Sequence, residues 1–335
     1  MSLWDLNARL ERTGDLSADN IDAAFAEIME GAAAHEEIKR FLNLSMPRMG
    51  DAKWIACGAR SLRARMVRVK APEGAIDVCG TGGDGAHTLN ISTAVALVVA
   101  GCGVPVAKHG NRAMSSKSGA ADVLEALGVK LTGDVAVLER CLAKAGVAFL
   151  FAQNHHPAMR HVALARRELG KRTIFNLLGP LSNPAGVSRQ LVGVFSAEFL
   201  TPMAEALKIL GCEKAWLVHG AGGLDELSAQ NPAANTLAIL DGGAVTSAAA
   251  TATADVHPDL RGGTASENAD EMRALLNGGG RPGHREAVII NAAAALVVAG
   301  RARDVSEGKP IAAQALATGA AQTALERLVA VTQST

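Results

Sequence analysis

The sequence predicts an α/β protein in which a small all-helical domain precedes a large α/β domain with a mainly parallel central sheet flanked by helices. Residues 1–70 show only the spacing of amphipathic helices, and from residue 71 short β-like runs alternate with helical stretches. Such alternation is typical of parallel sheets covered by helices, and 335 residues suffice for two domains. We therefore predict a helical domain over 1–70, joined by part of 159–186, and an α/β domain over 71–335.

The N-terminal region is predicted to form successive helices with recognisable ends. Ser17 can cap a helix in which Ile21 and Phe25 share one face, and Gly31 can end it. A second amphipathic helix follows, and Asp51 can cap a third. The spacing of apolar residues here favours helices packed on helices.

The larger region predicts the sheet and its covering helices. The expected strands are Ile76–Cys79, Val104–Ala107, Ala148–Phe151, Leu191–Phe195 and Ala215–Val218. The expected helices cover Ile91–Gly101, Ala120–Leu127, Val135–Ala145, Phe199–Leu210, Glu267–Leu276, Arg285–Ala299 and Ile311–Val329, and Asp241-Gly242-Gly243 predicts a hairpin turn. Because ligands bind beyond the carboxyl ends of parallel strands, the loops after these strands should carry the chemistry.

Composition argues against several classes of function. Lys and Arg together number 33, as do Asp and Glu, and aromatic residues make up 3%, which is unlike a nucleic-acid-binding protein. The five cysteines form no CxxC pair, which favours a reducing compartment. The longest apolar run, Ala94 to Ala107, is interrupted by glycine and proline and is too short to span a bilayer. We therefore expect a cytoplasmic protein with no membrane or nucleic-acid partner.

A glycine-rich segment, residues 77–85, follows the first expected strand. Glycines at this position let backbone N–H groups face a phosphate. Gly80, Gly82 and Gly85 also satisfy the GxGxxG pattern of dinucleotide-binding folds, which requires an acidic residue at the end of the second strand. That strand is instead followed by Lys108, which disfavours a nicotinamide cofactor and leaves phosphate binding or a plain turn.

A second segment, residues 108–119, follows the second expected strand and mixes cations with hydroxyl groups. It contains three permanent cations, a histidine, three serines and two glycines. A solvated basic loop is the ordinary interpretation of such a segment. The combination of point charges, directed hydrogen bonds and close backbone approach nevertheless favours binding of a phosphate-rich ligand.

Two further segments hold candidate ligands. Asp225 and Glu226 lie on a glycine-rich loop after the fifth expected strand, where paired carboxylates suit Mg²⁺ beside a phosphorylated substrate, although such a pair is commonly a solvated helix start. His155 and His156 are adjacent and lack the spacing of metal ligands. Arg166 is either an exposed residue on an amphipathic helix or a fork for a substrate carboxylate.

Taken together, these segments resemble one family, the anthranilate phosphoribosyltransferases of tryptophan biosynthesis. The resemblance extends over nearly the whole chain and is weakest in the first seventy residues and between Asn231 and Asp259. The motifs that carry it occur in order and are Gly80-Thr81-Gly82-Gly83-Asp84, Asn90-Ile91-Ser92-Thr93, Lys108-His109-Gly110-Asn111-Arg112, Ser115-Ser116-Lys117-Ser118-Gly119, His156-Pro157-Ala158-Met159, the run from Phe175 to Pro184, and Leu224-Asp225-Glu226.

The resemblance implies a set of site residues for 5-phosphoribosyl 1-pyrophosphate (PRPP), Mg²⁺ and anthranilate. PRPP would be held by the α/β domain through Gly80, Thr81, Gly82, Gly83, Asp84, Thr88, Asn90, Ile91, Ser92, Thr93, Lys108, Asn111, Ser115, Ser116 and, by backbone alone, Ala120. Two Mg²⁺ ions per subunit would be served by Ser92, Asp225 and Glu226. Anthranilate would contact Gly80, His109, Asn111, His156, Arg166 and Gly179, and the catalytic residues would be Lys108, His109 and Arg166.

The resemblance also implies a homodimer of the nucleoside-phosphorylase type and a direct reaction. The aryl amine of anthranilate would displace pyrophosphate at ribose C1 without a dedicated nucleophile on the enzyme. The sequence departs from the family at Ala120, where relatives often have serine, and in the loop 46–50. Two alternatives stay open here: a pyrimidine-nucleoside phosphorylase-like enzyme of the same fold, and a non-catalytic relative that binds nucleic acid.

Overall fold

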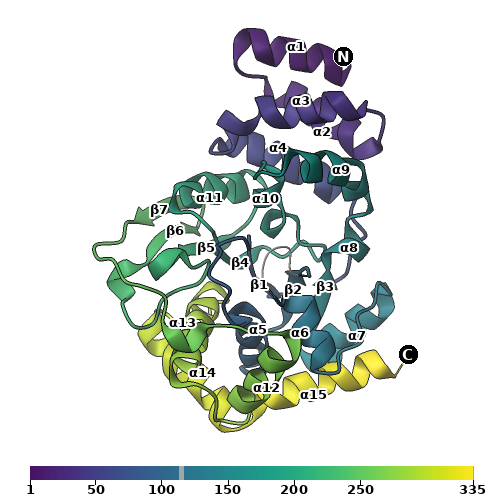
Figure 1. Cartoon of the computed structure of the whole chain (residues 1–335). Helices are drawn as coiled ribbons and strands as arrows, with labels where there is room; N and C mark the ends of the chain where they lie inside the picture. The colour runs from purple at the N-terminus through teal and green to yellow at the C-terminus, as the bar shows by residue number, and fades with distance from the viewer. Residues whose placement is uncertain (113–116, 335) are drawn as a thin grey trace.

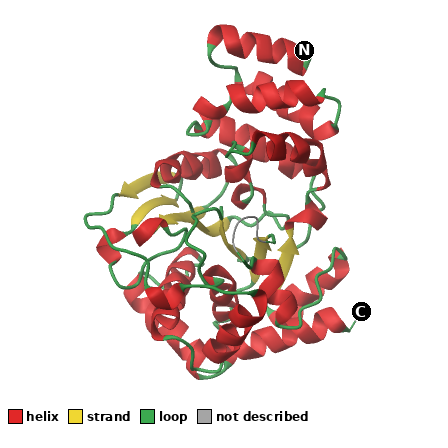
Figure 2. Ribbon diagram, in the orientation of Figure 1, coloured by secondary structure: helices red, strands yellow, loops and turns green. Residues whose placement is uncertain are grey.

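The computed structural model describes residues 1–112 and 117–334. Its larger part is built around a twisted sheet with helices on both faces, and a stack of N-terminal helices stands above it (Figure 1). Figure 2 shows the strands gathered at the centre of the larger part, between layers of helix. The predicted α/β fold class is thus confirmed.

The sheet has the order β3-β2-β1-β4-β5-β6-β7. Its strands are β1 (Ile76–Gly80), β2 (Val106–Gly110), β3 (Val147–Phe151), β4 (Arg189–Gly193), β5 (Lys214–His219), β6 (Thr236–Asp241) and β7 (Ala244–Ala248). The first five strands pair in parallel, and β6 and β7 add an antiparallel hairpin at one edge. The five predicted strands and the hairpin turn at residues 241–243 are therefore confirmed, although several ends differ by two or three residues.

The helices cover both faces of the sheet and form the N-terminal stack. They are α1 (Leu3–Thr13), α2 (Ala18–Glu30), α3 (His35–Leu44), α4 (Ala52–Ala64), α5 (Ile91–Gly101), α6 (Ala120–Ala126), α7 (Val135–Ala145), α8 (Ala152–His155), α9 (Arg160–Leu169), α10 (Phe175–Leu178), α11 (Leu200–Ile209), α12 (Ala265–Leu276), α13 (Pro282–Val298), α14 (Val305–Ala317) and α15 (Ala320–Gln333). Short 3₁₀ turns connect several of them, including Pro180–Ser182 after α10.

The ends of the N-terminal helices follow from their capping residues. The Ser17 hydroxyl accepts a hydrogen bond from the Asn20 N–H at the start of α2, and Gly31 ends that helix with a φ of 73°. The carboxylate of Asp51 accepts from the Lys53 N–H at the start of α4. Sequence analysis did not delimit α1, although Ser2 forms a capping box there.

Two apolar cores fill the molecule. One lies under the sheet among α5, α7, α12, α13, α14 and α15. The other begins in the N-terminal helices, where the Phe25 ring lies 5.4 Å from that of Phe41 and 5.7 Å from that of Phe175, and continues through α11 onto the opposite face of the sheet. Because α9 and α10 pack with α2, α3 and α4, part of the segment 159–186 joins the helical stack. The domain boundary at residue 70 stays a prediction.

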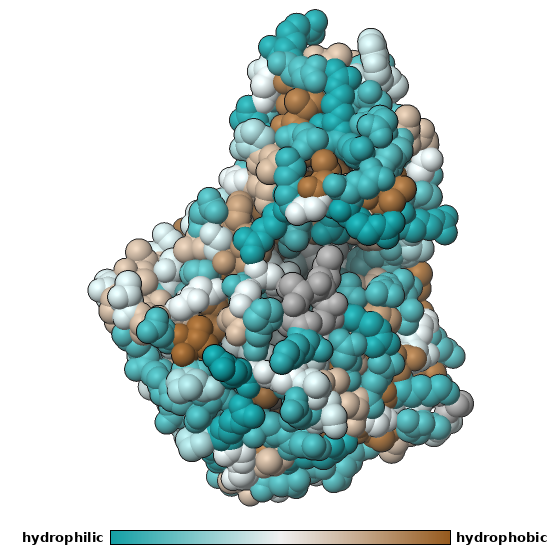
Figure 3. Space-filling view, in the orientation of Figure 1, coloured by the Kyte–Doolittle hydropathy of each residue, from teal (hydrophilic) through white to brown (hydrophobic). Residues whose placement is uncertain are grey.

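The C-terminal end differs from the sequence prediction. The single helix expected over Ile311–Val329 is two helices, α14 and α15, because Gly319 takes a left-handed φ of 74° between them. In the described part of the chain, no helix has the length and apolar character needed to cross a bilayer. The face seen in Figure 3 is mostly hydrophilic, with hydrophobic patches on the helical stack.

Candidate functional site

The order in which the chain adds parallel strands to the sheet reverses at one point, between β1 and β4. From β1 the chain continues to β2 and β3 on one side, whereas β4 and β5 lie on the other. Open α/β sheets bind ligands in the crevice outside the carboxyl ends of the strands at such a point. Gly80 and Gly193 are the final residues of β1 and β4 and pair in register, so the expected ligand position lies directly beyond them.

Glycine at both strand ends makes room for Asp225, which arrives on the loop after β5. A Cβ atom on Gly80 would lie 2.4 Å from the Asp225 Oδ2, and one on Gly193 would lie 1.5 Å from the Asp225 carbonyl oxygen. The N–H of Gly82 donates to the Asp225 Oδ2 at 3.0 Å. The glycine-rich loop after β1 and the acidic loop after β5 therefore meet above the switch point.

Glu226 ties the same acidic loop to the start of α5. The Ser92 N–H, in the first turn of α5, donates to the Glu226 Oε1 at 3.2 Å. The Oδ2 of Asp84 is buried nearby without a hydrogen-bond partner among the described residues. Burial and the charge of Asp84 raise the pKa of Asp225 to about 7, and burial and the charge of Asp225 raise the pKa of Glu226 well above its usual value. Converging carboxylates with raised pKa values form a site that favours a cation.

Lys108 contributes the buried positive charge beside these carboxylates. It lies within β2 rather than after it, because that strand runs to Gly110 instead of ending at Ala107 as predicted. Its Nζ donates to the Val78 carbonyl at 2.7 Å and to the Ser92 hydroxyl at 3.2 Å. Burial lowers the pKa of Lys108, and the charge of Asp77 opposes that shift most strongly. The ammonium group is thus held in place before any ligand arrives.

His109, the next residue of β2, points to the opposite face of the strand. Its Nδ1 lies 3.1 Å from the Gly179 carbonyl oxygen, and its ring centroid lies 5.1 Å from that of His156. Burial lowers the pKa of His109 to about 3 and that of His156 to about 4. Both rings are therefore neutral at pH 7, and the His109 Nε2 has no hydrogen-bond partner among the described residues.

Arg166 lies on α9, on the side of the site that belongs to the helical stack. Its guanidinium carbon lies 5.7 Å from the centroid of the Phe175 ring, a distance at which the cation and the ring attract each other. The side chain is half-buried, and burial lowers its pKa. The described residues offer it no carboxylate partner, so its hydrogen-bond donors stay available to a ligand.

The remaining predicted residues frame the two loops. The Thr81 hydroxyl accepts from the Phe195 N–H at 3.0 Å, and the Asn90 side chain accepts from Asn268 at 2.9 Å and donates to the Ser118 carbonyl at 3.3 Å. Thr88 forms an isolated β-bridge with Arg261, and the side-chain oxygen of Asn111 accepts a hydrogen bond from the Arg112 N–H. Ile91 and Thr93 are buried, and Ala120 is the first residue of α6. Ser115 and Ser116 lie outside the described residues.

Two residues that sequence analysis did not assign to the site lie against it. Arg172, in the linker between α9 and α10, donates to the Gly83 carbonyl and stacks 4.1 Å from the centroid of the Phe195 ring. Asp77, in β1, is completely buried. Arg112, which belongs to the segment predicted to bind a phosphate-rich ligand, pairs with Asp122 at 2.7 Å and Glu125 at 2.6 Å.

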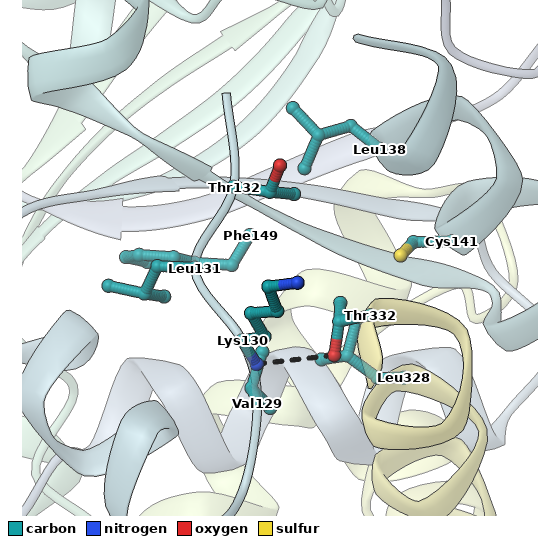
Figure 4. Close-up of a pocket in the computed structure, with 9 residues that line it drawn as sticks. All are labelled: Val129, Lys130, Leu131, Thr132, Leu138, Cys141, Phe149, Leu328 and Thr332. Carbon is teal, nitrogen blue, oxygen red and sulfur yellow. Dashed lines mark hydrogen bonds between the residues drawn. The ribbon is translucent and has the colours of Figure 1, made fainter. Parts of the chain in front are cut away.

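Two other features of the described residues do not suit a ligand. The cavity in Figure 4, between the loop 129–132, α7 and α15, has a volume of about 10 Å³, which holds at most one water molecule. His35, Glu36 and Glu168 could hold a metal by distance. The ammonium of Lys39 already pairs with both carboxylates, at 3.2 Å from Glu36 and 3.1 Å from Glu168, in the place that a metal would take.

Comparison with known proteins gives a consistent result. Residues 72–322 match the family described as "Glycosyl transferase family, a/b domain". The anthranilate phosphoribosyltransferase of Rhodospirillum rubrum is 52% identical over 321 residues, covering 94% of this chain and 92% of that protein. The one from Rhizobium meliloti is 50% identical over 325 residues, with 95% of each chain covered.

Solved structures agree with the sequence matches. The anthranilate phosphoribosyltransferase of Thermus thermophilus superposes with a TM-score of 0.89 at 38% identity, covering 98% of this chain and 99% of that one. The Saccharomyces cerevisiae enzyme, solved in complex with PRPP and Mg, gives 0.87 at 25% identity, covering 99% and 98%. These matches support neither the phosphorylase nor the nucleic-acid-binding alternative. The chain belongs to the anthranilate phosphoribosyltransferases, which transfer the phosphoribosyl group of PRPP to the amine of anthranilate.

Proposed function

We propose that the two substrates bind on opposite sides of β2, PRPP on the side of Lys108 and anthranilate on the side of His109. The opposite orientation of two consecutive side chains carries this proposal, because Lys108 reaches Ser92 and His109 reaches Gly179. The other residues proposed to contact PRPP are Gly80, Thr81, Gly82, Gly83, Asp84, Thr88, Asn90, Ile91, Ser92, Thr93, Asn111, Ser115, Ser116 and Ala120.

On the donor side, the chain supplies cation ligands and backbone donors for a pyrophosphate. Asp225, Glu226 and the Ser92 hydroxyl offer hard oxygen atoms, which Mg²⁺ prefers, and the buried, unpartnered Asp84 Oδ2 is a further such atom. Bound Mg²⁺ would neutralise charge on the departing pyrophosphate. We propose two Mg²⁺ ions per subunit, a number that calorimetric titration of Mg²⁺ in the presence of PRPP can count.

On the acceptor side, the chain offers two neutral imidazole rings and one cation. His109, His156 and Gly179 would line the aromatic ring of anthranilate, and Arg166 would bind its carboxylate in a two-point contact. Gly80 and Asn111 would complete the acceptor contacts. An aryl amine is neutral at pH 7, so it needs no base before it attacks ribose C1.

Catalysis would come from alignment and charge neutralisation, with no covalent intermediate on the enzyme. Lys108 lies between the strand and α5 with its ammonium fixed by Val78 and Ser92, so charge that develops on the leaving group meets a donor that need not reorganise. Binding both substrates at one strand end supplies the proximity.

Anthranilate fluorescence tests this function directly. We expect its signal to fall when the protein, PRPP and Mg²⁺ are all present and to persist when any one is omitted. Consumption of anthranilate that continues without PRPP or Mg²⁺ would contradict the proposed donor side.

We also propose a cytoplasmic homodimer. Its support is apolar exposure on the helical stack: Trp4 on α1 is 59% exposed and Leu164 on α9 is 44% exposed, and both helices pack against α3. Cysteines in the described residues are free thiols, in keeping with a reducing compartment. Sedimentation should give a dimer that Trp4→Glu dissociates; a monomeric wild type would contradict the proposal.

A further inference from the structure

A buried carboxylate in β1 contacts neither substrate in the proposed function. Asp77 is completely buried, although a buried carboxylate is costly unless other groups satisfy it. Its Oδ1 accepts from the His109 N–H at 3.1 Å, and its Oδ2 accepts from the Asn183 Nδ2 at 2.7 Å. A group so fully bonded in the middle of a sheet fixes the position of its partners.

The two partners of Asp77, His109 and Asn183, lie on either side of the contact between the His109 ring and the Gly179 carbonyl. His109 reaches the Gly179 carbonyl through its ring, and Asn183 follows Gly179 after the short 3₁₀ turn Pro180–Ser182. Asn183 is itself locked, because its Nδ2 also donates to the Ala107 carbonyl at 2.8 Å. One carboxylate thus holds the backbone of the histidine and the segment that supplies the histidine's acceptor.

From this arrangement we infer that Asp77 is a positioning residue for the acceptor site, setting the distance between the His109 ring and the 179–183 segment. The inference rests on the proposed function, in which that ring and Gly179 line the site for anthranilate. Asp77 touches neither substrate and acts only through its partners.

The positioning role of Asp77 can be separated from its charge. Asp77 carries the charge that most favours the ammonium form of Lys108, so removal of the carboxylate would also act on the donor side. Loss of the hydrogen bond from Asn183 keeps that charge and the hydrogen bonds of Lys108 to Val78 and Ser92. Its effect should therefore appear in the kinetic constants for anthranilate and not in those for PRPP.

The test is Asp77→Asn, which preserves size but replaces one accepting oxygen with an amide donor. We expect the KM for anthranilate to rise about tenfold or more, as for loss of a hydrogen bond to a charged group. A smaller rise is expected in the KM for PRPP, because Lys108 loses the charge that most favours its ammonium form. Glu271→Gln is the matched control, because Glu271 is a largely buried carboxylate that accepts from the Arg281 N–H at 2.7 Å and contacts His284 at 3.1 Å. It should lower the melting temperature and leave both KM values unchanged.

Asn183→Ala separates position from charge, and it also serves if Asp77→Asn does not fold. It breaks the link to Asp77 without removing charge, so it should raise the anthranilate KM and leave the PRPP KM within about twofold. Equal changes in both KM values of Asn183→Ala, or no change in the folded variants, would overturn the positioning role. Titration of the wild type with PRPP and Mg²⁺ distinguishes failure of this inference from failure of the proposed function. Absence of binding would overturn the proposed donor site as well. Normal binding, together with an unchanged anthranilate KM in the variants, would overturn this inference alone.

Discussion

The donor and acceptor sides of the site are built on different physical principles. On the donor side, carboxylates with raised pKa values face one buried lysine, and glycine backbone lies between them. On the acceptor side, the two histidines are neutral because burial lowers their pKa values, and the cation there is held by a ring rather than a carboxylate. The proposed donor side therefore needs a metal cation and a phosphorylated anion to be complete. The proposed acceptor side holds one cation, Arg166, that has no carboxylate partner among the described residues and is free to bind a substrate carboxylate.

The sharpest way to break this comparison is to remove the charge of the donor side. Changing Asp225 to Asn and Glu226 to Gln together should lower kcat by roughly 10³-fold at saturating Mg²⁺, because metal neutralisation contributes several kcal/mol. The control is the same pair of changes at exposed carboxylates, Glu213→Gln with Asp241→Asn. Turnover of the site variant within about tenfold of the control would contradict the metal assignment.

A smaller effect is expected from the acceptor cation. Arg166→Ala should raise the anthranilate KM about 10- to 150-fold, as loss of a charge-assisted hydrogen bond predicts, and should leave the PRPP KM nearly unchanged. Arg167→Ala removes the same charge from the exposed side of α9 and should change neither constant. Steady-state kinetics with each substrate varied in turn measures both constants. An unchanged anthranilate KM in Arg166→Ala would contradict the role of Arg166 in binding the acceptor.

Arg172 should give a more modest change on the donor side, although it comes from the linker that follows α9. Arg172→Ala removes the donor to the Gly83 carbonyl and the stack on Phe195, so the glycine-rich loop loses a support before PRPP binds. A threefold to tenfold rise in the PRPP KM is the order expected for such exposed contacts. Lys171→Ala is the matched control, and equal effects from both variants would show that charge alone matters.

The smallest expected effect is on the acceptor side, where the anthranilate KM should not depend on pH. With pKa values lowered to about 3 and about 4, His109 and His156 stay neutral from pH 5.5 upward, whereas an ordinary histidine would titrate near 6.5. The anthranilate KM should therefore stay constant over that range.

The donor side should depend on pH. The pKa of Asp225 is raised to about 7, and this carboxyl must lose its proton to bind a metal. The Mg²⁺ concentration required for half-maximal activity should therefore fall as pH rises through 7. A Mg²⁺ requirement independent of pH would contradict that assignment.

The two sides also differ in how far the sequence predicts them. The donor residues lie in contiguous motifs after strands, so Gly80, Asp84 and Asp225 could be proposed from local pattern and the topology rule together. Their mutual contacts could not, because these depend on loops that are 143 residues apart in the chain, as in the hydrogen bond from Gly82 to Asp225.

Other features escaped prediction for local reasons. The extension of β2 through Lys108 and His109 was missed because charged residues are seldom buried in strands, and here Asp77 and the Val78 carbonyl compensate them. The break between α14 and α15 depends on Gly319, a residue that a helical pattern tolerates at moderate cost. Arg172 gave no signal, since its partners are a backbone carbonyl and a ring distant in sequence.

The alternation of side chains along β2 has a consequence for how such an enzyme can change. Lys108 and His109 are consecutive, yet the proposed function assigns them to different substrates, because a strand presents neighbouring side chains to opposite faces. Substitutions on one face can thus retune acceptor choice while the leaving-group chemistry is preserved. A one-residue insertion or deletion in the same strand would exchange the faces of both side chains at once, so this short stretch should accept substitutions far more readily than changes of length.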